Sequence, residues 1–101
     1  MHILSKATLM RFARKHPETK AALLTWHHDV SKAKWLIPND VKKKHARASI
    51  INAKRVVFDI NPGAYRLVVD IEYKWALVFI VAIMTHKEYD RINVEDLEYN
   101  G

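Results

Sequence analysis

Ten apolar residues run without interruption from Trp75 to Met84, and this stretch constrains the fold more than any other. The run is rich in Val, Ile and Phe and is about half as long as a helix that crosses a bilayer, so it predicts a strand buried on both faces. The polar sequence Thr85-His86-Lys87-Glu88-Tyr89-Asp90 follows at once. The end of this strand therefore places ionisable groups on a rigid support, where reactive sites are commonly built.

Two more strands precede the apolar run. Residues 55–60 alternate in a pattern typical of a half-buried strand, and residues 65–73 alternate again, with Arg66 on the open face. The sequence Asn61-Pro62-Gly63-Ala64 between them predicts a turn, because Pro presets one dihedral angle and Gly accepts a positive φ. If the next hairpin turns near Lys74, Arg66 lies opposite residues 82–84 and therefore close to the polar sequence.

The N-terminal half is predicted to be mostly helical. Residues 2–5 form an edge strand, Ser5 caps a helix over residues 6–15, and Pro17 begins a second helix. In the second helix Leu23, Trp26 and Val30 recur with the spacing of a face that packs on a sheet.

Residues 31–54 are predicted to be irregular, with Asp40 capping a short helical turn, and residues 94–101 are expected to be loosely held. A chain of 101 residues is long enough for one core. We predict a single α+β domain over residues 1–101, in which an N-terminal helical hairpin packs on a small antiparallel sheet.

Positive charge is concentrated in the first 60 residues, which hold 13 of the 17 Lys and Arg residues but only 4 of the 11 Asp and Glu. This imbalance indicates a polyanionic partner such as a nucleic acid, although a merely soluble basic protein fits composition alone equally well. The middle of the chain carries a basic belt, which either contacts RNA phosphates or is a solvated loop. The residues of the belt that we predict to bind RNA are Lys42, Lys43, Lys44, Arg47, Lys54 and Arg55.

The polar sequence and Arg66 together could cleave RNA without a metal. Such a reaction needs a group that acts as acid or base, which could be His86, and cations at the phosphate, which could be Arg66 and Lys87. Tyr89 could stack on a base or donate its hydroxyl to the phosphate. The structural alternative is a helix start in which Thr85 and Glu88 form a capping box, and the two interpretations are compatible. The chain has no Cys and no spaced His or carboxylate motif, so we predict neither a metal nor a cofactor.

These motifs in this order resemble the HigB-type toxins of bacterial toxin–antitoxin systems, which belong to the RelE/ParE superfamily. Three pieces carry the likeness: Tyr65-Arg66-Leu67 after the turn, the apolar run, and the polar sequence that ends at Asp90. The resemblance implies a small RelE-like α+β toxin that cleaves messenger RNA, usually on the translating ribosome. It also implies a cognate helix-turn-helix antitoxin, and a catalytic set of Arg66, His86, Lys87 and Tyr89.

A second interpretation remains open at this stage, because a shared fold does not settle the chemistry. ParE-like relatives bind and inhibit a protein target such as DNA gyrase without cutting RNA, and a basic RNA-binding module without catalysis is a third possibility. The combination of Arg66, His86 and Tyr89 favours the nuclease, since a pure binding toxin has no need to assemble it. The N-terminus lacks a signal-peptide pattern, so we expect a cytoplasmic protein that has no membrane partner.

Overall fold

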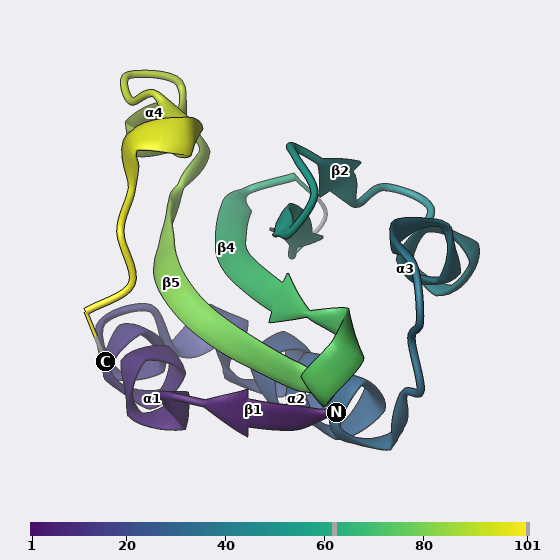
Figure 1. Cartoon of the computed structure of the whole chain (residues 1–101). Coiled ribbons are helices and arrows are strands. Elements are labelled where there is room, and N and C mark those ends of the chain that lie inside the picture. Colours follow the sequence, from purple (N-terminus) through teal and green to yellow (C-terminus); the bar gives the residue numbers. More distant parts are fainter. Residues whose placement is uncertain (62, 101) are drawn as a thin grey trace.

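The computed structural model describes residues 1–61 and 63–100, which fold into a mixed five-stranded sheet with its two longest helices packed together on one face (Figure 1). The strand order is β1-β5-β4-β3-β2. The helices and strands are β1 (His2–Leu4), α1 (Lys6–Lys15), α2 (Lys20–Lys32), α3 (Pro38–Lys44), β2 (Ser49–Ile50), β3 (Arg55–Ile60), β4 (Tyr65–Glu72), β5 (Leu77–Thr85) and α4 (His86–Tyr89), with short 3₁₀ turns at Pro17–Thr19, Tyr73–Trp75 and Val94–Asp96. The predicted α+β class is confirmed.

The predicted helical hairpin is present as α1 and α2, which lie together beneath the sheet in Figure 1. Leu23, Trp26 and Val30 are buried as the periodicity predicted, and they form part of one core with residues of β3, β4 and β5. The predicted cap at Ser5 is wrong. Ser5 has a positive φ of 73° and its side chain does not cap α1; its hydroxyl instead bonds to the Tyr99 hydroxyl at 2.6 Å.

The sheet contains more strands than the alternation predicted. The three expected antiparallel strands are β3, β4 and β5, and β1 and β2 extend the sheet at its two edges. β1 pairs with β5 in parallel, and β2 pairs with β3 over two residues. β1 confirms the edge strand that was predicted over residues 2–5. Its parallel pairing makes the sheet mixed, whereas an antiparallel sheet was predicted. β2 has only two residues, too few to show a period of two, so the sequence pattern could not reveal it.

The turn between β3 and β4 has the predicted form at the residues that the structure describes. The Ala64 amide donates to the Asn61 carbonyl at 3.0 Å, and Gly63 has the positive φ of 81° that favours glycine. Pro62, the second residue of the predicted turn, lies outside the described residues.

The apolar run is less buried than predicted. Val78 and Ile80 are buried, but residues 81–85 are only half-buried, and Trp75 is 67% exposed. Trp75 lies in the turn before β5 because Ala76 adopts a left-handed conformation, with a φ of 55°. The strand therefore begins at Leu77.

The segment expected to be irregular also contains regular structure. α3 begins at Pro38, and Asp40 lies in its first turn, where its carboxylate accepts hydrogen bonds from the backbone amides of Leu36 and Ile37 at 2.9 and 3.3 Å. Asp40 was predicted to be the capping residue, but it lies inside the helix and accepts hydrogen bonds from backbone amides that precede the helix. β2 follows at Ser49.

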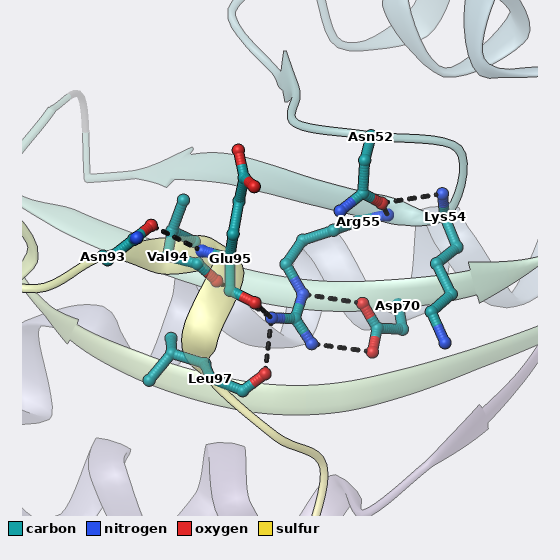
Figure 2. Close-up of polar contacts among 8 residues, drawn as sticks. All are labelled: Asn52, Lys54, Arg55, Asp70, Asn93, Val94, Glu95 and Leu97. Atoms are coloured by element: carbon teal, nitrogen blue, oxygen red, sulfur yellow. Dashed lines mark hydrogen bonds and ion pairs between the residues drawn. The ribbon is translucent and has the colours of Figure 1, made fainter.

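The C-terminal segment, which was expected to be loosely held, crosses the face of the sheet opposite the helices. Figure 2 shows the Arg55 guanidinium between Asp70 and the backbone carbonyls of this segment. Farther along, the Tyr99 ring packs edge-on against Phe79 with ring centroids 5.0 Å apart. β3, predicted to be half-buried, has both faces buried, with Val56 and Phe58 in the core and Val57 on the opposite face only 2% exposed.

Candidate functional site

The candidate site lies where β4 begins and β5 ends. Arg66 pairs with Met84 across the two strands, within the predicted range of residues 82–84. Tyr65 pairs with Thr85, so β5 passes directly into α4 beside the first residues of β4. Residues 66 and 86–90 are thereby brought to one corner of the sheet, where the short helix α4 follows β5 (Figure 1).

A capping box fixes the start of α4, as predicted. The Glu88 amide donates to the Thr85 hydroxyl at 3.2 Å, and the Thr85 amide donates to the Glu88 carboxylate at 3.0 Å. The Thr85 amide and the Thr85 hydroxyl, which both donate to the Glu88 carboxylate at 3.0 Å, lower the pKa of Glu88 and so keep its carboxylate ionised. The His86 amide also donates to the Ala64 carbonyl at 2.9 Å, so the helix start is attached to the turn that precedes β4.

Arg66 and His86 are in direct contact. An Arg66 Nη lies 3.0 Å from Nδ1 of His86, and because a guanidinium can only donate, Nδ1 accepts this hydrogen bond. Arg66 is itself held by the Gly63 carbonyl at 2.8 Å and by the Asp59 carboxylate at 3.4 Å. The other ring nitrogen of His86, Nε2, lies 3.2 Å from the Asp90 carboxylate. This arrangement places the proton of neutral His86 on Nε2.

Tyr89 completes the cluster. The Arg66 guanidinium carbon lies 5.8 Å from the centre of the Tyr89 ring, within the range of a cation–π contact. Burial is the main cause of a raised Tyr89 pKa, so its phenol remains protonated at neutral pH. The structure therefore brings together three of the four predicted site residues, whereas Lys87 lies on α4 with its side chain exposed to solvent.

Sequence reasoning missed two carboxylates that contact the site. Asp90 was left without a role although it lies four residues after His86, a spacing that brings two side chains together on a helix. Asp59 pairs with Arg66 across β3 and β4. The hairpin register around the turn at residues 61–64 could have identified it.

The basic belt is confirmed only as an exposed surface, and RNA contact by it stays a prediction. Lys43, Lys44, Arg47 and Lys54 are exposed. Lys42 is exposed as well, but its ammonium donates to the carbonyls of residues 46 and 48 at 2.8 and 2.7 Å, which also gives it a structural role after α3.

Arg55 does not belong to this exposed belt, which corrects the prediction. It is 6% exposed and forms two hydrogen bonds of 2.8 Å with the Asp70 carboxylate. Its remaining guanidinium nitrogen donates to the carbonyls of Val94 and Leu97 (Figure 2). Asp70 is its partner in the β3–β4 register, and an Arg opposite an Asp under a covering segment forms an ion pair rather than binding RNA.

Comparison with known proteins gives the family. The family model described as HigB_toxin, RelE-like toxic component of a toxin–antitoxin system, matches residues 19–92. The chain belongs to the HigB toxin family. The matched region includes α2, the whole β3–β5 sheet and the site residues of α4.

Three relatives of this HigB-family toxin have similar length. The mRNA interferase toxin HigB of Escherichia coli strain K12 is 26% identical over 92 residues, which are 89% of this chain and 88% of the relative. The proteins named mRNA interferase HigB from Escherichia coli O157:H7 and Shigella flexneri have the same identity and coverage. Membership of the family makes this chain the toxic component of a toxin–antitoxin system, with an antitoxin as partner. Among the described residues, none of the helices is both long and apolar enough to span a membrane.

Proposed function

We propose that this toxin is an endoribonuclease that cleaves messenger RNA, with Arg66, His86, Lys87 and Tyr89 as its site. The observation that carries the proposal is the contact of 3.0 Å between Arg66 and Nδ1 of His86, at a corner that also holds Tyr89 and Asp90. Related proteins of similar length are named mRNA interferases.

The reaction uses the 2′-hydroxyl of the RNA as the nucleophile and needs no metal. The substrate phosphate takes over the Arg66 guanidinium, which matches its geometry bidentately, and this frees Nδ1 of His86. Nδ1 then accepts the 2′-hydroxyl proton, while the 2′-oxygen bonds to phosphorus and the bond from phosphorus to the 5′-oxygen breaks. The imidazolium returns the proton to that leaving oxygen. The products are a 2′,3′-cyclic phosphate and a 5′-hydroxyl.

The other residues of the site stabilise the charges that form during cleavage and position the RNA. The Asp90 carboxylate faces Nε2 of His86 and stabilises the imidazolium, in the way that a carboxylate orients a catalytic histidine. Arg66 and the Lys87 ammonium neutralise the phosphate as its charge grows. The protonated Tyr89 ring stacks on a base or orients the phosphate through its hydroxyl.

The proposal extends to the setting in which the toxin acts. Residues 1–101 form one domain, the message is cut in the cytoplasm on the translating ribosome, and the antitoxin is a helix-turn-helix protein. The exposed cations Lys43, Lys44, Arg47 and Lys54 would contact the phosphates of messenger and ribosomal RNA. Lys42 would contribute charge to the same surface.

Mapping message ends in cells tests this function. Expression of the wild-type protein is expected to arrest growth and to create new 5′ ends inside messages, detected by primer extension, and His86→Ala is expected to abolish both. A toxin that instead inhibits gyrase would leave messages uncut and produce DNA breaks. Growth arrest without new message ends would therefore overturn the proposal.

A further inference from the structure

A cavity of about 310 Å³ lies at the β3 edge of the sheet, next to the candidate site. It is open to solvent and is bordered by α2, by the connection from α3 to β2, and by the last residues of β3. Residues that matter for its chemistry are Trp26, His45, Arg47, Phe58, Asp59 and Asn61. Its volume is at the lower end of the range of about 300–1,000 Å³ that is typical of pockets for small ligands.

The strand edge in this cavity has backbone groups that pair with no strand. β2 pairs with β3 only as far as Val57, so residues 58–60 form an open edge on that side. The Arg55 carbonyl bonds toward the β2 side, to the Ile51 amide, and alternation along an antiparallel strand directs the peptide groups of residues 57 and 59 the same way. Asp59 therefore presents one backbone donor and one backbone acceptor to the cavity.

Polar side chains add to this edge. Trp26 is only 4% exposed, and its indole N–H has no hydrogen-bond partner within the described part of the chain, which is unusual for a buried donor. The Asn61 side-chain nitrogen donates a hydrogen bond to the Glu18 carbonyl at 2.8 Å. The side-chain oxygen of Asn61 is therefore the atom that can accept a hydrogen bond from a ligand. The Arg47 guanidinium is exposed at the rim and forms no ion pair with any described residue.

The walls of the cavity are aromatic. The Trp26 and His45 rings each pack edge-on against Phe58, with ring centroids 5.4 and 5.0 Å apart. Burial lowers the pKa of His45, so this ring is neutral at physiological pH. The cavity wall therefore carries no positive charge at His45. Aromatic walls beside a donor and an acceptor suit a flat ring with a polar edge.

One residue links the cavity with the candidate site. Asp59 lines the cavity, and its carboxylate also lies 3.4 Å from the Arg66 guanidinium. A ligand in the cavity therefore contacts the backbone of the residue whose carboxylate pairs with Arg66, the group that would hold the scissile phosphate.

We propose that this cavity binds one nucleobase of the RNA substrate, next to the phosphate on which Arg66 and His86 act. The base packs against the side of the aromatic cluster that faces the cavity, its polar edge pairs with the Asp59 backbone and Asn61, and Arg47 holds a flanking phosphate. This subsite rests on the proposed nuclease function and makes the toxin selective for the base at one position beside the cut.

The test is a titration followed by ¹H–¹⁵N NMR, with nucleoside 5′-monophosphates of the four bases and with ribose 5-phosphate as the matched ligand without a base. Mononucleotides contain no bond that the toxin can cut, so the wild-type protein is used. At least one nucleotide is expected to shift the Asp59 amide and the Trp26 indole signal saturably, with the exposed Trp75 indole as internal control. Equal shifts with ribose 5-phosphate, or no shifts, would overturn the subsite.

A filled cavity gives the second arm. Ala46 lies at the exposed rim, so Ala46→Phe is expected to fill the cavity, weaken nucleotide binding about tenfold and raise the KM for short RNAs with kcat retained. Ala53→Phe, on an exposed loop outside the cavity, is the matched control. If Ala46→Phe binds nucleotides as the wild type does, the subsite is wrong while nuclease activity can stand. If nucleotides bind but no RNA is cut, the subsite stands and the proposed function fails.

Discussion

The Arg66 guanidinium donates to Nδ1 of His86 at 3.0 Å, although 20 residues separate them in the chain. The β4–β5 register brings them together, and the capping box of Thr85 and Glu88 directs the chain so that His86 faces back toward β4. His86 is thus held by an arginine on one ring nitrogen and a carboxylate on the other. Five predictions follow from this arrangement and from the structure that supports it.

Arg66→Ala is expected to lower the rate of RNA cleavage by about 10²–10³-fold, because the phosphate loses its bidentate partner. Arg66→Lys is expected to recover only part of this loss, since an ammonium carries the charge without the planar fork. Initial rates on one message measure both effects. Arg11→Ala, which removes an exposed arginine on α1, is the matched control and should cut at the wild-type rate.

Asp90→Asn is expected to slow cleavage about tenfold or more, because the imidazolium that forms on His86 loses its carboxylate. KM is expected to change little, since Asp90 contacts His86 and not the phosphate in this arrangement. The separate measurement of kcat and KM is decisive. A rise in KM with kcat unchanged would assign Asp90 to RNA binding instead.

Thr85→Ala is expected to destabilise the fold by about 1 kcal/mol through loss of the α4 cap. The lowered pKa of Glu88 has a defined consequence for pH: the carboxylate stabilises the helix start above the ordinary glutamate pKa, and this contribution is lost as the pH falls through the lowered value. Thermal unfolding at several acidic pH values measures this loss. In Glu88→Gln the corresponding part of the pH dependence should disappear.

Asp70→Ala is expected to cost about 3–5 kcal/mol of unfolding free energy, because the buried Arg55 guanidinium loses its carboxylate. Replacement of both residues by apolar ones, Arg55→Met with Asp70→Leu, should restore most of this stability. Urea unfolding measures both variants. In the double variant the carbonyls of residues 94 and 97 also lose their donor, so that segment should be cut faster by a protease.

Acid is expected to destabilise the protein through His45. Burial lowers the pKa of His45 in the folded state. As the pH falls, the unfolded chain therefore binds a proton at this histidine before the folded protein does. The free energy of unfolding consequently decreases below the ordinary histidine pKa. Melting temperatures at about pH 7.5 and about pH 5.5 span this range. His45→Gln should flatten the difference, whereas His28→Gln, at an exposed position of α2, should leave it as it is.

Sequence reasoning reached the core of this fold because its signals were local and periodic. Alternation over β4 assigned Arg66 to the open face, and a turn near Lys74 placed it opposite residues 82–84, a range that contains its partner Met84. The capping box could likewise be recognised from Thr85 and Glu88 alone. These features depend on spacing along the chain, which a sequence displays directly.

The features that sequence reasoning missed depend on distant contacts. Nothing in a run of cations distinguishes Arg55 from its exposed neighbours, because its burial results from Asp70 across the hairpin and from a C-terminal segment about 40 residues away. The loss of the predicted Ser5 cap has the same origin, since Tyr99 takes its hydroxyl. Trp75 was assigned to the buried strand by its apolarity, but a left-handed residue at position 76 turns the chain there.

The most direct test of the account uses a short synthetic message whose cleavage position is first mapped with the wild-type toxin in a translation reaction. The same message is then made with a single 2′-deoxynucleotide on the 5′ side of that position. We predict that the all-ribose message is cut to a 2′,3′-cyclic phosphate and a 5′-hydroxyl, that the deoxy message stays intact at that position, and that Arg66→Ala and His86→Ala cut neither. Cleavage of the deoxy message at the same position would contradict the account, because the 2′-hydroxyl would then not be the nucleophile that His86 activates.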